Sequence, residues 1–387
     1  MPDYSIPLST PKISGNEWQY VKECLDTEWV SSAGKYVELF EEKITEYTGA
    51  KYAVACVNGT SALQVALKLA GVIPGDEVIV PTITFIAPVN AIHYNGAKPI
   101  FMDADFFYNI DVKKTIEFIN NETVFKNGFT FNKTTDKKIT AILPVHVWGN
   151  AACLDELVPV CKDRNIAIVE DAAEGMGTRY INGEYSGKHT GTIGLLGCLS
   201  FNGNKIITTG GGGMILTDDV DLAEKAKYLT KQAKDDRLRY IHHEIGYNFR
   251  LTNIQAALGV AQLEQLPRFL ERKGEISHQY QNALKGVDGL SIADVPNYAD
   301  NNHWMNVLQI DNAVYGEDRD SIMQRLEKNR IQTRPVWALN HLQKPYKDCQ
   351  SYKIERANKL LNCSLCLPSS TNLNEGEIHK VVDTIYG

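Results

Sequence analysis

Runs of apolar residues with few polar interruptions recur through the first half of the chain, separated by segments with helical periodicity. A strand with one face in water alternates apolar and polar side chains, whereas a parallel strand covered by helices on both faces is apolar throughout. We therefore expect an α/β fold in which a mostly parallel sheet lies between helices. The runs that we interpret as strands are residues 52–57, 78–81, 98–103, 141–145 and 166–171.

The second half of the chain has a different pattern. A long helix with a bend at Pro267 is predicted to lead out of the sheet region, and helices mixed with short strands follow it. We interpret residues 1–255 as a large domain and residues 256–387 as a smaller α+β domain. A polar, irregular segment at about 108–138, with a partial helix near 115–120, is expected to be an insertion between strands.

The composition limits the classes of partner. With 387 residues, 43% of them hydrophobic, the chain is long enough for two domains with sizeable cores. The net charge of −7 provides no basic footprint for nucleic acid. No apolar stretch is long enough to cross a membrane, and Met1 to Ser5 do not begin a signal peptide. The eight cysteines lack paired zinc spacing, so we expect reduced thiols, no metal and a cytoplasmic protein.

Lys205 lies between a polar turn that begins at Ser200 and four consecutive glycines, Gly210 to Gly213. Most lysines are solvated surface residues, and the amine becomes a useful nucleophile only when its pKa is lowered. The glycines favour a functional interpretation, because they let the backbone approach a ligand closely. We hypothesise that Lys205 forms a Schiff base with pyridoxal phosphate.

Gly59, Thr60 and Ser61 follow a predicted strand and open a predicted helix. A helix N-terminus binds phosphate through its unpaired N–H groups and its dipole, and the two hydroxyls add further donors. The alternative is that Thr60 or Ser61 only caps the helix. The turn is not a P-loop, because no Gly-Lys-Ser/Thr sequence follows it.

Asp171 stands at the carboxyl end of a predicted strand, where open α/β sheets bind ligands. A carboxylate out of water needs a partner, and a protonated pyridine nitrogen is one that also lets the ring accept electrons. An exposed acidic loop is the alternative.

Phe85 could stack on a flat ring or belong to the core, and His341 could be catalytic or structural.

Four motifs follow one another between residues 75 and 250: Gly-Asp-Glu-Val-Ile-Val-Pro from Gly75, Glu-Asp-Ala-Ala-Glu from Glu170, Ser-Phe-Asn-Gly-Asn-Lys from Ser200 and Gly-Tyr-Asn-Phe-Arg from Gly246. The ordered set resembles the DegT-type nucleotide-sugar aminotransferases, a branch of the fold-type I pyridoxal-phosphate enzymes. This resemblance implies a large domain with a mostly parallel seven-stranded sheet and a smaller C-terminal α+β domain.

The resemblance also implies roles for single residues. Lys205 is the Schiff-base lysine, Asp171 pairs with the pyridine nitrogen, and Phe85 covers one ring face. Asn248 reaches the phosphate bound to the neighbouring subunit of a homodimer. Many relatives have Gln or His in place of Glu174, which either donates a proton to the phenolic oxygen of the cofactor or shares one with it. The expected cofactor-binding residues are Gly59, Thr60, Ser61, Phe85, Asp171, Glu174, Ser200, Asn202, Lys205 and Asn248, with Thr60, Ser61 and Ser200 on the phosphate, and the expected substrate residues are His341 and Asn248.

The Asn-Gly-Asn before Lys205, the Thr-Thr-Gly after it and Glu174 resemble members that aminate carbon 4 of a 4-keto-6-deoxy sugar. The long insertion and the Cys-Leu-Pro-Ser-Ser sequence from Cys366 resemble the subgroup that serves legionaminic acid synthesis. The expected reaction moves the amino group of glutamate to UDP-4-keto-6-deoxy-N-acetylglucosamine in two alternating half-reactions, which implies ping-pong kinetics.

Four other activities are alternatives. One is a GDP-sugar 4-aminotransferase of the perosamine type. A sugar dehydratase with the same cofactor has histidine in place of the lysine, so Lys205 argues against it. A non-catalytic pyridoxal-phosphate sensor usually carries a DNA-binding module, and neither terminus has the room or the basic charge for one. A dinucleotide-binding protein is disfavoured, because the glycines follow the lysine segment rather than opening a helix.

Overall fold

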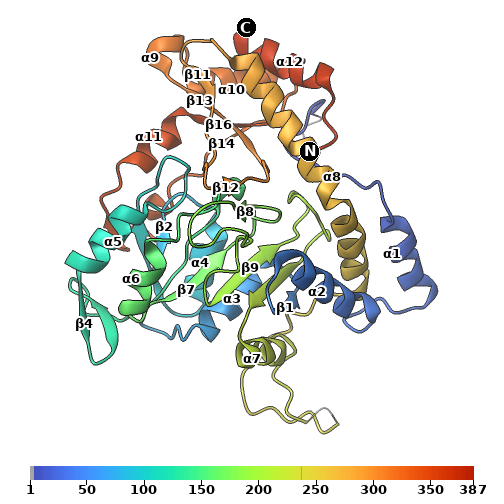
Figure 1. Ribbon diagram of the computed structural model, residues 1–387, viewed down its shortest axis with the longest axis vertical. Coiled ribbons are helices and arrows are strands. Elements are labelled where there is room, and N and C mark those ends of the chain that lie inside the picture. Colours follow the sequence, from blue (N-terminus) through green and yellow to red (C-terminus); the bar gives the residue numbers. More distant parts are fainter. Residues whose placement is uncertain (1–3, 237) are drawn as a thin grey trace.

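The computed structural model describes residues 4–236 and 238–387, and an eight-stranded sheet lies at its centre (Figure 1). Within this sheet β10 alone runs antiparallel to its neighbours. The expectation of a mostly parallel sheet is therefore confirmed. In order across the sheet, the strands are β1 (Tyr52–Cys56), β10 (Gly213–Thr217), β9 (Leu196–Ser200), β7 (Ala167–Asp171), β6 (Ile139–Ile142), β2 (Glu77–Pro81), β3 (Lys98–Met102) and β15 (Ser351–Tyr352).

The sheet has one strand more than the seven that the resemblance implied. The extra strand, β15, comes from the C-terminal part of the chain and pairs in parallel with Phe101 and Met102 of β3. It covers a sheet edge that would otherwise expose unpaired backbone groups. A strand of two residues is too short to carry a periodic pattern, so the sequence contains no signal for it.

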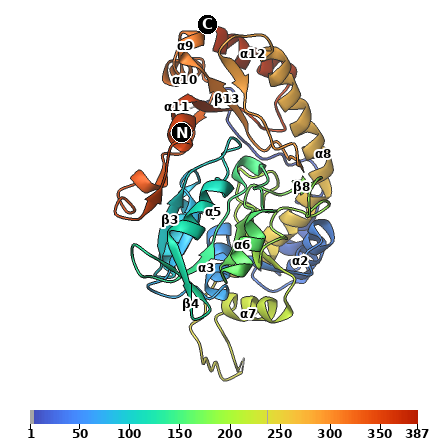
Figure 2. The same ribbon diagram turned by 60° about the vertical axis from the view of Figure 1, so that its left-hand side comes forward.

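Helices cover both faces of the sheet, as the continuous apolar strands predict (Figures 1 and 2). Alternate side chains of a strand point to opposite faces, so Val78 and Val80 pack with α3, α4 and α7, whereas Ile79 packs with α5 and α6. On the second face, α2 and the first part of α8 lie over β1 and β10. The bounds are α2 (Lys35–Thr48), α3 (Gly59–Leu69), α4 (Ile86–Tyr94), α5 (Val112–Asn121), α6 (Leu157–Asp163), α7 (Val220–Thr230) and α8 (Asn253–Leu284).

The segment at 108–138 lies between β3 and β6 in the chain and contains the helix expected near 115–120, but the expectation that it is otherwise irregular is wrong. Asp111 caps α5 by accepting the Lys114 N–H at 3.0 Å, and Phe118 and Ile119 of this helix are fully buried. Because only one stripe of α5 faces the core, its sequence is mostly polar. A hairpin follows, made of β4 (Thr123–Lys126) and β5 (Phe129–Asn132).

The C-terminal part of the chain forms a second, four-stranded sheet with its own core (Figure 1). α8 joins the two cores as a single helix that contains Pro267. Ile6 belongs to the second core as well, and it pairs with Ile331 in a parallel bridge. The domain division at 255/256 stays a prediction. The helix α1 (Glu17–Asp26) belongs to the N-terminal part of the chain and packs on α8. The elements of the C-terminal part are β11 (Leu290–Ile292), β13 (Asn306–Ile310), α9 (Asn312–Tyr315), α10 (Arg319–Lys328), β14 (Arg334–Pro335), α11 (Arg356–Cys363), β16 (Ser364–Leu367) and α12 (Glu375–Tyr386).

Among the described helices, none is both long and apolar enough to span a bilayer. The described ranges also hold no group of three His, Cys, Asp or Glu side chains placed to bind a metal ion. The expectation about the first five residues falls partly on Met1 to Asp3, which lie outside the described residues.

Candidate active site

The loop 201–212, between β9 and β10, holds Lys205 at the carboxyl end of the sheet strands. The Phe201 N–H donates to the Gly212 carbonyl at 2.8 Å and so closes the loop at its base. Gly210 has a φ of +78°, a left-handed conformation that glycine adopts without strain. The polar turn and the glycines around Lys205 therefore serve to fix its backbone.

The side chain of Lys205 points into the protein rather than into bulk water, with 13% of it exposed. Its Nζ lies 3.0 Å from Oε1 of Glu174 and 4.4 Å from the centre of the Trp304 ring. The amine is thus held between a carboxylate and an aromatic face, as expected for a functional lysine rather than a solvated one.

Glu174 is buried, and both of its carboxylate oxygens accept hydrogen bonds. Oε1 faces Lys205, and Oε2 accepts the backbone N–H of Trp148 at 2.7 Å. Trp148 lies in a short 3₁₀ turn, η1 (Val147–Gly149), and has a left-handed φ of +56°. Strained backbone of this kind persists where the surroundings enforce it, often at functional sites. Here the strained residue aims its N–H at Glu174.

Asp171 ends β7 and is 4% exposed. Within the described part of the chain, one hydrogen bond reaches its carboxylate, from the Ala173 N–H to Oδ1 at 3.0 Å. Burial raises the pKa of Asp171 to about 6, and Glu174 adds to the rise, while the Ala173 N–H and Lys205 oppose it. A buried carboxylate with so few donors has the capacity to accept a further one.

The predicted phosphate residues come together at the N-terminus of α3. A Cβ built on Gly59 would lie 2.9 Å from the Cβ of Ser200, so the two predicted segments are in contact. Asn58 caps the helix by accepting the Ser61 N–H at 2.8 Å, which makes the alternative of a Thr60 or Ser61 cap wrong. Neither of these two hydroxyls is hydrogen-bonded to another described residue, so both are available to a ligand.

These features fit pyridoxal phosphate. The inward Lys205 amine suits an aldehyde, the under-bonded Asp171 carboxylate suits a protonated pyridine nitrogen, and the α3 N-terminus with its hydroxyls suits a phosphate. All three lie at the same end of the sheet, where parallel strands place ligands.

Two other predicted residues lie at the surface. Phe85 precedes α4 and is 56% exposed, so it is not part of the core, and its ring is accessible for stacking. Asn202 is exposed and donates to Oδ1 of Asn204 at 3.0 Å.

Among the described residues, no hydrogen bond or ion pair joins Asn248 or His341 to the side chain of Lys205. Asn248 is exposed and pairs with Lys231 in an isolated bridge. His341 lies in a second 3₁₀ turn, η2 (Asn340–Leu342), where its Nδ1 is 2.7 Å from Oγ1 of Thr82, and burial lowers its pKa. The assignment of both residues to the substrate stays a prediction.

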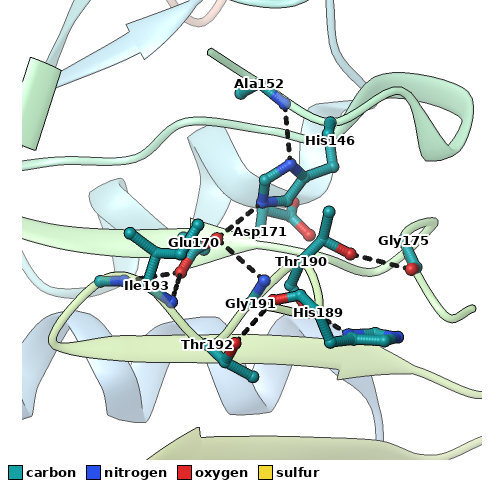
Figure 3. A network of polar contacts seen from close by, with 12 residues as sticks. His146, Ala152, Glu170, Asp171, Gly175, His189, Thr190, Gly191, Thr192 and Ile193 are labelled. Carbon is teal, nitrogen blue, oxygen red and sulfur yellow. Dashed lines mark hydrogen bonds and ion pairs between the residues drawn. The ribbon is translucent and has the colours of Figure 1, made fainter. Parts of the chain in front are cut away.

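A network of buried polar groups lies behind Asp171 (Figure 3). Glu170 precedes Asp171 on β7 and is fully buried, with no lysine or arginine bonded to it in the described ranges. Burial would raise the pKa of Glu170, but hydrogen bonds from His146 and from backbone N–H groups hold it below its usual range. The donors are Ile193 N–H at 2.7 Å and Gly194 N–H at 2.6 Å on Oε1, and Gly191 N–H at 2.8 Å and His146 Nε2 at 2.9 Å on Oε2.

Two buried histidines complete this network, and their hydrogen bonds fix their tautomers. His146 accepts the Ala152 N–H on Nδ1 at 3.0 Å, so its proton is on Nε2, which donates to Glu170. His189 accepts the Gly177 N–H on Nε2 at 2.8 Å and donates from Nδ1 to Thr190. Burial lowers the pKa of His189 to about 4. Both rings are therefore neutral supports for the segment that carries Asp171 and Glu174.

The sequence analysis did not identify Trp148, Trp304, His146 or the structural role of Glu170. A strand alternates its side chains, so the position of Glu170 next to Asp171 already implied that the two carboxylates face opposite sides. Trp304 has no comparable signal, because it contacts Lys205 from about a hundred residues further along the chain.

Comparison with known proteins identifies the family of the chain. The model of the DegT/DnrJ/EryC1/StrS aminotransferase family matches residues 11–386. EpsN of Bacillus subtilis (strain 168), whose name describes a pyridoxal phosphate-dependent aminotransferase, is 36% identical over 98% of this chain and 95% of its own length. GDP-perosamine synthase of Caulobacter vibrioides is also 36% identical, over 97% of this chain and 96% of its own. The structure of the aminotransferase TlmJ from Streptoalloteichus hindustanus superposes with a TM-score of 0.87 at 27% identity, covering 98% of each chain.

The family model spans almost the whole sequence, the solved relative shares the fold, and the residues at the strand ends fit the cofactor. The chain therefore belongs to the DegT/DnrJ/EryC1/StrS family and is a pyridoxal-phosphate-dependent aminotransferase.

Proposed function

We propose that this protein transfers the amino group of glutamate to carbon 4 of a nucleotide-linked 4-keto-6-deoxy sugar, with Lys205 as the Schiff-base lysine. One observation carries the assignment of Lys205: its amine is turned inward, 3.0 Å from Glu174, at the strand end where the buried carboxylate of Asp171 lies. The amino donor and the sugar are proposed from the family resemblance of the sequence motifs.

Each residue has a distinct task in this proposal. When bound, pyridoxal phosphate supplies a ring that accepts electrons from the carbon that loses a proton. Lys205 Nζ moves that proton as general base and then general acid, and Asp171 keeps a proton on the ring nitrogen. Thr60, Ser61 and Ser200 hold the phosphate at the positive end of α3.

The nucleotide is proposed to be GDP. The 36% identity to a GDP-perosamine synthase over nearly the full length of both chains supports this choice. The UDP-linked sugar of legionaminic acid synthesis is the other candidate, and the long insertion and the Cys-Leu-Pro-Ser-Ser sequence from Cys366 favour it. The two candidates differ in a nucleotide that a substrate panel can vary directly.

The test incubates the purified protein with glutamate and a panel of GDP- and UDP-linked 4-keto-6-deoxy sugars, followed by mass analysis of the sugar and assay of 2-oxoglutarate. We expect an amino sugar from a GDP-linked substrate, and amination of the UDP-linked sugars alone would overturn the GDP assignment. Release of ammonia without an amino sugar would indicate the dehydratase instead.

A second test concerns Lys205 itself. Borohydride reduction should leave the cofactor covalently attached to the peptide that contains Lys205. Lys205→Ala should lose this label and all transamination, whereas Lys188→Ala, a change at an exposed lysine, should keep both. Wild-type turnover by Lys205→Ala would refute the proposed function.

We further propose a homodimer in which Asn248 reaches the phosphate of the partner subunit. The described residues 231–236 and 238–248 project beyond α7, away from the main sheet (Figures 1 and 2). They expose 91% of Leu238 and 80% of Ile245, apolar surface that an interface would bury. Sedimentation should show a dimer that Leu238→Asp with Ile245→Asp weakens, and Asn248→Ala should lower cofactor affinity. A monomeric wild-type protein with full activity would contradict this.

A further inference from the structure

A short segment of the C-terminal part of the chain crosses onto the loop that carries Glu174. We define residues 299–304 as the crossing segment. It begins as β12 (Ala299–Asp300), which pairs antiparallel with β8 (Arg179–Tyr180), a strand that follows the Glu174 loop in the sequence. It ends at Trp304, whose ring lies over the Lys205 amine. The crossing segment thus connects the second sheet with the proposed catalytic lysine.

Asn302 attaches the crossing segment to the Glu174 loop. Its amide is 1% exposed, and Nδ2 donates to the carbonyl of Glu174 at 2.7 Å and to that of Met176 at 2.9 Å. Its backbone N–H donates to Oγ1 of Thr178 at 3.1 Å, and Oδ1 accepts the Trp304 N–H at 2.9 Å. One buried side chain therefore bonds both to the loop that carries Glu174 and to the residue that covers Lys205.

Trp304 is held at three points besides its ring face. The backbone N–H bonds to Asn302, Nε1 donates to the carbonyl of Asn204 at 2.8 Å, and the carbonyl accepts from Nζ of Lys273 at 2.8 Å. Because the side chain is 3% exposed and anchored at each end, its ring has little freedom to move away from Lys205.

From these contacts we infer that Trp304 and Asn302 are positioning residues for proton transfer by Lys205. The inference rests on the proposed function, in which Nζ takes a proton from one carbon and returns it to another, so that the lysine ends unchanged. Between these two steps Nζ is an ammonium group on a flexible chain of four methylenes. The face of an aromatic ring attracts an ammonium, and Glu174 attracts it from the other side. The Trp304 ring and the Glu174 carboxylate together keep Nζ in reach of both carbons. Misplacement of a reacting group by about 1 Å can slow a reaction about a hundredfold.

The sharpest experiment compares Trp304→Phe with Trp304→Leu in the full chain. Both variants lose the indole N–H that bonds to Asn204, and only Phe retains an aromatic face, so the pair isolates the contact of the ring with Nζ. We measure the glutamate half-reaction and the sugar half-reaction separately, in single turnovers followed by the cofactor absorbance.

We expect Trp304→Leu to slow both half-reactions by about the same factor, roughly tenfold, with unchanged affinity for glutamate and for the sugar. Trp304→Phe should stay within about threefold of wild type. Equal effects of the two variants, or a loss confined to one half-reaction or to substrate affinity, would overturn the inference, because a substrate contact or a general loss of structure would act in that way.

A second readout needs no bound cofactor. In the cofactor-free full chain, the labelling rate of the Lys205 amine by reductive methylation is measured by peptide mass spectrometry. Labelling should be several-fold faster in Trp304→Leu than in Trp304→Phe, and equal rates would contradict the inference. If the thermal melt shows that Trp304→Leu does not fold, Trp304→Met replaces it with the same expectation. Failure of these comparisons leaves the proposed function standing, whereas retained turnover in Lys205→Ala removes both.

Discussion

Glu170 and Asp171 are neighbours on β7, both are buried, and they have opposite electrostatic surroundings. Glu170 accepts four hydrogen bonds, and its pKa lies below the usual range. Asp171 accepts one within the described residues, and burial raises its pKa to about 6. The first carboxylate is satisfied by the protein alone, while the second is left for a partner that the protein does not supply.

Two adjacent residues thus have different functions: Glu170 supports the fold, and Asp171 is available to a ligand. A buried group whose hydrogen bonds are complete stabilises the fold, and one whose hydrogen bonds are incomplete stores a free-energy cost that a ligand removes. The alternation of side chains along a strand allows both kinds of carboxylate to stand side by side without sharing an environment.

The largest effect is expected from Glu170→Gln. Whichever way the new amide turns, its NH₂ group faces two of the four donors, and buried N–H groups are left without acceptors. We expect the free energy of unfolding to fall by roughly 3–5 kcal/mol, because each buried N–H group left without an acceptor costs about 1–3 kcal/mol. Urea denaturation measures this. Glu184→Gln, at an exposed position, should change it by less than about 0.5 kcal/mol. A tolerated Glu170→Gln would remove the distinction between the two carboxylates.

Asp171→Asn should have the opposite effect on the cofactor-free protein. The folded-state pKa of about 6 lies above the ordinary value of 3.8, so the neutral acid favours the fold below about pH 4, and this contribution is lost as the pH rises through 6. The wild-type protein at pH 8 therefore bears a cost that Asn lacks, roughly 2–3 kcal/mol. The melting temperature of Asp171→Asn should be higher than that of the wild-type protein at pH 8, and the two melting temperatures should become equal near pH 4.

With the cofactor bound, the wild-type protein should be more stable than Asp171→Asn, because the pyridine nitrogen then satisfies the Asp171 carboxylate. The variant should also lose most of its transamination rate, since Asn cannot hold the ring nitrogen protonated. A variant that is less stable than wild type at pH 8 without the cofactor would contradict the contrast with Glu170.

The smallest effect on stability is expected at Thr190, whose hydroxyl supports the loop that carries Glu174. Thr190 donates from Oγ1 to the Gly175 carbonyl at 2.8 Å, so Thr190→Val should lower the free energy of unfolding by about 1 kcal/mol. Because Gly175 adjoins Glu174, cofactor affinity should fall as well. Thr192→Val is the matched control, since its hydroxyl bonds to His189 within the same loop. If the two variants had the same cofactor affinity, Thr190 would not act on the site.

Local sequence patterns predicted five of the eight strands of the main sheet and missed β9, β10 and β15, and they singled out Asp171 and Lys205 as candidate site residues. Uninterrupted apolar runs indicate strands that are covered on both faces, and the strand end at Asp171 and the glycines after Lys205 each point to a ligand. Both residues lie at the same end of the sheet, because parallel strands bring their carboxyl ends to one edge.

The features that sequence reasoning missed depend on contacts between distant segments. The sequence places Glu170 in a strand, but it does not show that His146 and the loop 191–194 surround its carboxylate with hydrogen-bond donors. Trp304 approaches Lys205 only after α8 has carried the chain to the second sheet. The strand β15 and the buried stripe of α5 are too short or too polar to stand out against the surrounding sequence.

The bridge between Ile6 and Ile331 affects how the protein folds during its synthesis on the ribosome. A ribosome adds about 5–20 residues each second, so the segment around Ile6 waits roughly 16–65 seconds before its partner has been made. During that interval the nascent chain exposes an apolar stretch that only the last-made quarter of the polypeptide can cover. Completion of the second core is thereby postponed until synthesis is nearly finished.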